Sequence, residues 1–266
     1  MKDVFHWSWW RARPKLWFSY SLLVIVGWAG FIFFRVLNWT RVRGWGRFQK
    51  WRRQRNGREK RNIIMVSNHL TMFDSFIVGI IAFFPEIIFY PSVAPYNLAA
   101  KENYFRNGIL RLLMWCLHAL PVKSSRVDVE VMQRVVQLLP GANAHIFPGG
   151  RRSYAPLGSE PSHPVRGGIG YVLANAPTPK PLVVPVFISG VQKLFGGQPG
   201  KSDWRRWFIR PTGFFRRPLV IFGDPVEWQD IIQNLGNTKQ AWEAIARRVA
   251  EAINRLDPAQ VETIDR

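Results

Sequence analysis

The chain has 266 residues, of which 47% are hydrophobic, and 13 of them are tryptophans. This length and composition exclude a disordered chain and suit one catalytic domain with an appendage. The formal net charge of +20 indicates an anionic partner, either nucleic acid or an anionic membrane surface. With Cys116 as the single cysteine, an internal disulfide and a multi-cysteine metal site are excluded.

The first predicted element is an apolar helix over residues 16–34, with the sequence LWFSYSLLVIVGWAGFIFF and no charged side chain. Such a run is long enough to cross about 30 Å of hydrocarbon. Residues 1–40 are therefore expected to anchor the chain to a membrane, as a spanning helix or as a helical hairpin in one leaflet. More cations follow the run than precede it, which favours a cytoplasmic location for the rest of the chain. A buried soluble helix is the alternative.

The segment 41–61 is rich in arginine and lysine and contains one carboxylate, Glu59. Its interleaved Trp45 and Trp51 suit base stacking in a nucleic-acid-binding protein. Its position directly after an apolar helix instead favours a polybasic juxtamembrane linker that attracts anionic lipids. Anionic membrane lipids are thus the expected partner, and nucleic acid is not.

Residues 62–266 alternate between strand and helix patterns and are expected to form one domain. Short apolar runs predict strands at 62–66, 86–92, 144–147, 182–189 and 218–223. Helical spacing predicts helices over 74–84 and 105–120, and a last one from a cap at Asn237–Thr238 to near Asp257. The alternation predicts an α/β fold with a mixed, largely buried sheet flanked by helices.

His69 and Asp74 stand five residues apart, after the first predicted strand and at the start of the next helix. Folds of this class display reactive side chains at strand ends. A carboxylate bonded to one ring nitrogen fixes the tautomer of the histidine, so the other nitrogen can take a proton from a hydroxyl. The spacing alone is weak evidence, because Asp74 also suits a helix cap and can serve in both ways.

The stretch NHLTMFD (68–74) resembles the NHxSxxD signature of the glycerolipid and lysophospholipid acyltransferases, which include the 1-acylglycerol-3-phosphate O-acyltransferases. Asn68 is retained, and Thr71 stands in place of the family's small polar residue. AAKENYFRNG is similar to the family's second block, with Lys101 and Gly108 in the expected places. The block ends near LPVKSSR, where either Lys123 or Arg126 would supply its basic residue.

Later motifs follow in the family's order. FPGGRRS (147–153) resembles the block FPEGTRS, and VRGG (165–168) resembles the element after it. VVPVFISG and FGDPV are similar to later elements, so the resemblance extends from residue 62 to about 226.

The resemblance implies an acyltransferase of phospholipid biosynthesis or remodelling. It would move a fatty acyl group from acyl-CoA or acyl-carrier protein to a lysophospholipid hydroxyl, with 1-acylglycerol 3-phosphate preferred. His69 would be the general base and Asp74 would orient it, with no metal and no tightly bound cofactor. The residues implied in substrate binding are Asn68, Thr71, Lys101, Gly108, Lys123, Arg126, Phe147, Pro148, Gly150, Arg151 and Arg152.

One departure from the family pattern leaves alternatives open. Gly149 stands where the family has glutamate, and Arg151 where it has threonine, which indicates an altered acceptor or a weakened enzyme. AHIFPGG and VRGGIG also resemble the tafazzin-like branch, which implies a phospholipid–lysophospholipid transacylase that needs no CoA. A non-catalytic membrane lipid-binding protein on this fold is the third interpretation.

Overall fold

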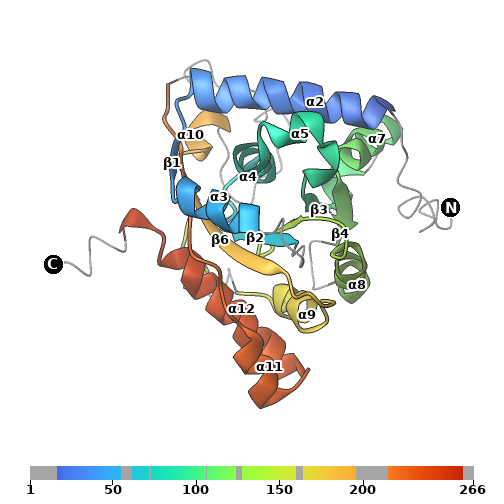
Figure 1. The fold of residues 1–266 in the computed structure, drawn as a ribbon, viewed down its shortest axis with the longest axis vertical. Coiled ribbons are helices and arrows are strands. Elements are labelled where there is room, and N and C mark those ends of the chain that lie inside the picture. The colour runs from blue at the N-terminus through green and yellow to red at the C-terminus, as the bar shows by residue number, and fades with distance from the viewer. Residues whose placement is uncertain are drawn as a thin grey trace.

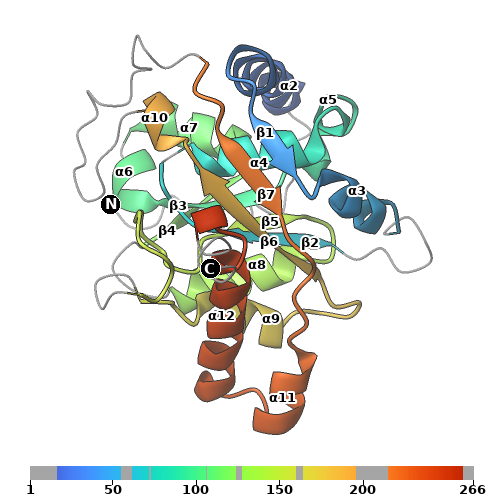
Figure 2. The same ribbon diagram turned by 90° about the vertical axis from the view of Figure 1, so that its left-hand side faces the viewer.

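The computed structural model describes residues 17–54, 62–71, 73–105, 107–123, 128–159, 164–195 and 215–259. Its strands form one seven-stranded sheet in the order β1-β7-β6-β2-β5-β3-β4 (Figures 1 and 2). All neighbouring strands are parallel except β6 and β7, which pair antiparallel. The strands are β1 (Arg41–Arg43), β2 (Ile63–Ser67), β3 (Tyr96–Ala100), β4 (Ala119–Val122), β5 (Ala144–Ile146), β6 (Leu182–Ser189) and β7 (Leu219–Phe222).

Helices cover both faces of the sheet, which is why every residue of the central strand β2 is buried. Because side chains alternate along a strand, Ile64 and Val66 pack in one apolar cluster, and Ile63 and Met65 pack in the other. The first cluster includes α8 (Val129–Leu138), α9 (Gly168–Ala174), α11 (Gln229–Leu235) and α12 (Lys239–Asn254). The second includes α2 (Trp17–Phe31), α3 (Trp45–Gln54), α4 (Asp74–Phe83), α5 (Glu86–Phe89) and α10 (Gln192–Phe195).

The predicted α/β fold is confirmed, and most predicted elements appear within one or two residues. The strands at 62–66, 144–147, 182–189 and 218–223 are β2, β5, β6 and β7, and the helix over 74–84 is α4. The last helix, α12, begins at the predicted cap, where Thr238 Oγ1 accepts a hydrogen bond from the Ala241 N–H at 3.2 Å.

Other predicted elements need correction. The segment 86–92 is not a strand but α5 followed by a 3₁₀ turn at Pro91–Val93, because a short apolar run between two prolines has no periodicity that distinguishes strand from helix. The helix expected over 105–120 is shorter, α7 (Gly108–Cys116), and the chain then enters β4. The sequence did not predict β1, β3 or β4.

The apolar run at the start of the chain forms α2, which continues as a π-helix from Ile32 to Leu37. The expectation of a spanning helix is not met, since within the described ranges no helix combines the length and the apolar character needed to cross a bilayer. One side of α2 packs on α4, α5 and α7, and Leu23 on it is buried in the core.

The expected linker 41–61 contains β1 and α3. β1 forms the edge of the sheet, and α3 is fixed through the fully buried Phe48. Gly44 between them has φ +72°, and a Cβ there would lie 2.0 Å from the carbonyl oxygen of Phe222, so only glycine fits this turn.

Candidate active site

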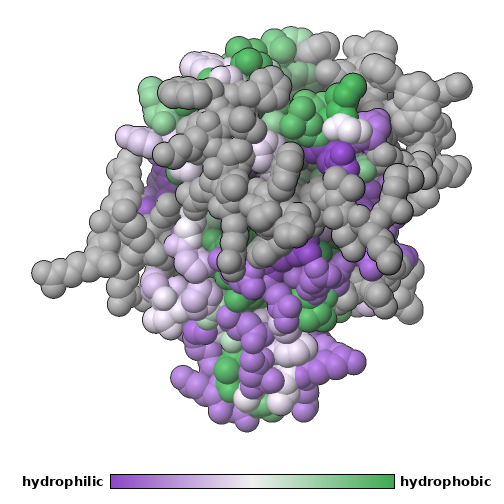
Figure 3. Space-filling model, turned by 90° about the vertical axis from the view of Figure 1, so that its right-hand side faces the viewer, coloured by the Kyte–Doolittle hydropathy of each residue, from purple (hydrophilic) through white to green (hydrophobic). Residues whose placement is uncertain are grey.

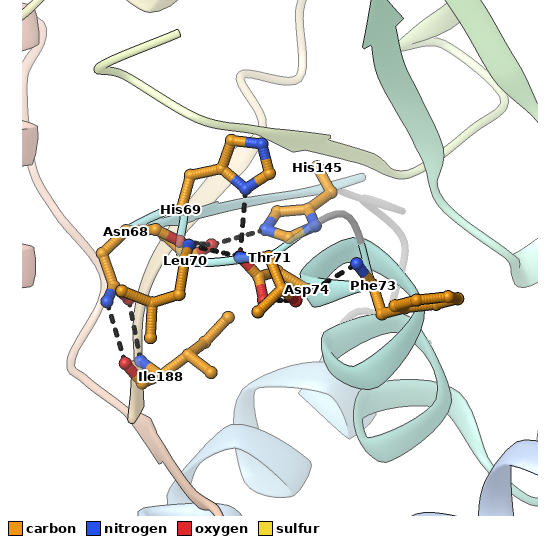
Figure 4. A network of polar contacts seen from close by, with 9 residues as sticks. Asn68, His69, Leu70, Thr71, Phe73, Asp74, His145 and Ile188 are labelled. Atoms are coloured by element: carbon orange, nitrogen blue, oxygen red, sulfur yellow. Dashed lines mark hydrogen bonds and ion pairs between the residues drawn. The ribbon is translucent and has the colours of Figure 1, made fainter. Parts of the chain in front are cut away.

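The loop that leaves β2 is held in place by its first residue. The side-chain oxygen of Asn68 accepts a hydrogen bond from the Ile188 N–H, and its amide donates to the Ile188 carbonyl, both at 2.8 Å (Figure 4). Ile188 lies on β6, the neighbour of β2 in the sheet. The amide therefore continues the β2–β6 pairing by one residue and fixes where the next side chain, His69, begins.

Asp74 orients His69 from the first turn of α4. Its Oδ2 lies 3.0 Å from His69 Nδ1, and the carboxylate is fully buried. It also accepts hydrogen bonds from the Leu70 N–H at 2.5 Å, the Thr71 N–H at 2.8 Å and the Thr71 hydroxyl at 2.6 Å. Asp74 therefore binds three residues of the preceding loop, His69, Leu70 and Thr71. It is not the N-cap of α4, which is Phe73.

This geometry determines which nitrogen of His69 is available for chemistry. A carboxylate only accepts hydrogen bonds, so Nδ1 carries the proton and donates it to Asp74. The lone pair then lies on Nε2, and His69 lines the cavity described below. The arrangement is that of a general base with an orienting carboxylate.

Two contacts from the loop after β5 complete the placement of His69. The ring of Phe147 stacks on the imidazole at a centroid distance of 3.9 Å and an interplanar angle of 16°. The N–H of Ser153 donates to the His69 carbonyl at 2.8 Å. The segment FPGGRRS thus contacts both the ring and the backbone of His69.

A cavity of about 880 Å³ opens at His69, within the size range of small-molecule sites. Much of its lining is apolar and comes from α2 and the π-helix after it, from α4, and from α7 and the residue that follows it, including Val26, Phe33, Phe76, Ile80, Met114 and Leu117. Lys123, Arg151, Arg152 and Arg166 also line it. The cavity therefore offers an apolar surface and a cationic surface to one ligand.

The charge balance of the cavity favours an anion. Among the described lining residues the one carboxylate is Asp128, and it is engaged as the N-cap of α8, accepting from the Val131 N–H at 3.3 Å. No ion pair joins Arg151 or Arg152 to a carboxylate of the described chain. Burial, and then the charge of Arg151, lower the pKa of Arg166. Such a set of cations is suited to bind phosphate.

The structure brings together most of the residues expected in the site. Phe147, Pro148, Gly150, Arg151, Arg152 and Lys123 line the cavity beside His69, and Thr71 supports Asp74. Lys101 and Gly108 are exposed on α6 (Lys101–Tyr104) and α7 and do not line it. Arg126 lies outside the described residues.

Sequence reasoning missed three residues near the site. Arg166 lines the cavity, and the motif VRGG that contains it was the available signal. Tyr104 also lines it. The pKa of its hydroxyl is raised, mainly by burial; the charge of Arg152 opposes this shift, and the charge of Asp74 adds to it. His145, which the sequence only placed in a strand, is buried, and its ring contacts Ser67 at the end of β2, two residues before His69.

Comparison with known proteins agrees with this geometry. The protein family described as Acyltransferase matches residues 49–189, more than half of the chain, including both NHLTMFD and FPGGRRS. Comparison with curated protein sequences finds no match. The family match covers more than half of the chain, and the chain therefore belongs to the acyltransferase family.

Proposed function

We propose that this protein is an O-acyltransferase that moves a fatty acyl group from a thioester, acyl-CoA or acyl-carrier protein, to the free hydroxyl of a lysophospholipid. The observation that carries the proposal is the His69–Asp74 pair, 3.0 Å apart, beside a cavity with both apolar and cationic lining. The family match supports acyl transfer, and the cavity supports a substrate with a hydrocarbon chain and an anionic headgroup.

His69 acts as the general base. Its Nε2 takes the proton from the acceptor hydroxyl, and the resulting oxygen nucleophile attacks the thioester carbonyl carbon. The tetrahedral intermediate collapses with cleavage of the C–S bond, and the thiolate receives the proton from His69. Asp74 stabilises the imidazolium during these steps. The products are an ester and a free thiol.

The acceptor we propose is 1-acylglycerol 3-phosphate. Arg151, Arg152 and Lys123 offer guanidinium and ammonium groups to its phosphate, and a phosphate monoester carries close to two negative charges at neutral pH. Gly149 removes the carboxylate that the family has next to these cations, which leaves the surface more positive. A dianionic headgroup fits this surface better than a zwitterionic one.

The apolar lining is proposed to hold fatty chains. It includes residues of α2 and α4, among them Ala29, Gly30 and Ile80. Burial of a chain is worth about 0.8 kcal/mol for each methylene group. A long-chain donor or acceptor is therefore bound much more tightly than its short-chain analogue.

We also propose that the protein binds the surface of an anionic membrane. Hydrophobic side chains gather at the end of the molecule where α2 lies (Figures 1 and 3). Three helices carry exposed large hydrophobic residues: Ile25 and Trp28 on α2, Phe89 and the adjoining Tyr90 at the end of α5, and Ile109 and Leu112 on α7. Cations on β1 and α3 would attract anionic headgroups, each by about 1 kcal/mol near the surface.

The experiment combines one donor with one acceptor at a time, using the purified full chain in phospholipid vesicles. Acyl-CoA, acyl-carrier protein and phospholipid donors are each offered to lysolipids with monoester, diester and zwitterionic headgroups, and the products are identified by mass spectrometry. The proposal expects turnover with a thioester donor and a monoester acceptor. It also expects a loss of at least about 100-fold in His69→Ala.

Two other outcomes would replace the proposal. Turnover with a phospholipid donor and no thioester would assign a transacylase. Lysolipid binding without turnover above the His69→Ala background, for every pair tested, would assign a non-catalytic lipid-binding protein.

A further inference from the structure

A second histidine, His145, lies close to the segment that carries His69. His145 on β5 is fully buried, and its Nε2 lies 2.9 Å from the Ser67 hydroxyl, while its Nδ1 has no hydrogen-bond partner. Burial, and then the charge of His69, lower the pKa of His145 to about 3, so the ring is neutral. An apolar side chain at position 145 would pack in the sheet without leaving a buried nitrogen unpaired. The polar contact therefore calls for an explanation.

The contact with Ser67 leads to the backbone of His69. The Ser67 hydroxyl donates to the carbonyl of Asn68 at 2.9 Å, and a hydroxyl has one hydrogen to donate. His145 Nε2–H is consequently the donor to Ser67 Oγ. These two hydrogen bonds hold the peptide between Asn68 and His69 on the β5 side. The Asn68 side chain holds the same segment on the β6 side, through its bonds to Ile188.

A second contact leads to the ring of His69. Residues 145 and 147 project to the same side of the chain at the end of β5. The His145 ring lies 4.7 Å from the Phe147 ring, and Phe147 stacks on His69 at 3.9 Å. One buried side chain thus supports both the peptide before His69 and the aromatic ring against its face.

We propose that His145 is a positioning residue for His69, acting through Ser67 and Phe147. The proposal rests on the proposed function, in which His69 is the base. His145 does not line the cavity, so it acts on the geometry of proton transfer and not on substrate binding. A misplacement of a catalytic group by about 1 Å is enough to lower the rate about 100-fold.

The test compares variants of the full chain in the acyl-transfer assay, with kcat and KM measured separately. His145→Phe keeps an aromatic ring and removes the hydrogen bond, and Ser67→Ala removes the other partner. Both are expected to lower kcat about tenfold or more with KM changed less than about twofold. His145→Gln, which can still donate to Ser67, recovers most of the lost kcat. The double variant is no slower than the slower single variant, because both changes break one hydrogen bond.

His118→Phe is the matched control. The His118 ring also makes a hydrogen bond, from Nδ1 to the Ala94 carbonyl at 3.2 Å, but His118 is not among the residues that line the cavity. Its replacement lowers thermal stability and leaves kcat per folded molecule unchanged. Circular dichroism melting supplies the stability and the folded fraction of each variant.

The outcomes separate the positioning role from the proposed function. If the wild type shows no turnover above His69→Ala, the proposed function fails. If the wild type is active and His145→Phe or Ser67→Ala keeps its kcat per folded molecule, the positioning role is overturned. Should His145→Phe not fold, Ser67→Ala and His145→Gln decide in the same way.

Discussion

Burial of His145 makes the stability of the fold depend on pH. Burial and the charge of His69 lower its pKa from 6.5 to about 3 in the folded chain. In the unfolded chain the imidazole has its ordinary pKa of about 6.5. Between these two values the unfolded chain binds the proton and the folded chain does not. The free energy of unfolding therefore falls as the pH falls through this window.

The size of the effect follows from the two pKa values. Each pH unit well inside the window is worth about 1.4 kcal/mol, so this group is expected to cost about 2 kcal/mol of stability between about pH 8 and about pH 5. His145→Gln removes the titrating group and keeps a donor for Ser67. Its free energy of unfolding should change by about 2 kcal/mol less over the same range than that of the wild type.

Urea unfolding followed by tryptophan fluorescence measures both proteins at several pH values. Other titrating groups are common to the two chains, so their contributions cancel in the difference. An identical pH dependence in wild type and His145→Gln would refute the reasoning, because it would mean that His145 takes up a proton equally in both states.

Three further predictions concern the cationic side of the cavity, the hydrogen bond from Thr71 to Asp74, and the packing of α9 on α12. Arg152→Ala should raise KM for a monoester lysophospholipid about tenfold or more with little change for a zwitterionic one, as steady-state kinetics would show. Equal losses for both would contradict the proposed preference of Arg152 for a dianionic phosphate monoester. Thr71→Val removes the 2.6 Å hydrogen bond to Asp74 and should lower kcat about tenfold, while Thr71→Ser keeps the activity. Gly170→Ala places a Cβ 1.9 Å from a backbone oxygen of α12 and should destabilise the fold by about 2 kcal/mol or more in urea unfolding. Gly46→Ala, with open space around its Cβ, should cost nothing comparable.

The proximity of His69 and Asp74 could be predicted because its determinants are local in the chain. A buried strand, a short loop and a helix follow one another from Ile63 to Phe83, and each has its own pattern of apolar residues. His69 and Asp74 stand at the two ends of the loop, so strand and helix together set their separation. The hydrogen bonds of Thr71 and Leu70 to Asp74 are also local.

Contacts between distant segments could not be predicted in the same way. Asn68 bonds to Ile188, 120 residues later, and His145 reaches Ser67 across 78 residues. No local pattern encodes such pairs; they depend on the order of the strands in the sheet. The same limit explains why the sequence did not predict that α2 packs on the domain and contributes to the lining of the cavity.

Sequence motifs place residues along the chain and do not show which of them line the cavity. Lys101 fits the second block of the family by sequence, yet it is exposed and does not line the cavity, whereas Arg166 in the VRGG element does. A motif specifies spacing along the chain, and the direction of each side chain is set by the turn on which it lies.

Proton transfer by His69 is tested most directly by a thiol-release assay with the full chain in vesicles that contain 1-acylglycerol 3-phosphate and a long-chain acyl-CoA. Free CoA thiol and diacylated phosphate ester are quantified together for the wild type, His69→Ala and Asp74→Asn. The wild type should release thiol and form ester in equal amounts, and only when the acceptor is present. His69→Ala should be slower by at least about 100-fold, with Asp74→Asn also impaired. Ester formation in His69→Ala at the wild-type rate would contradict the assignment of His69 as the base.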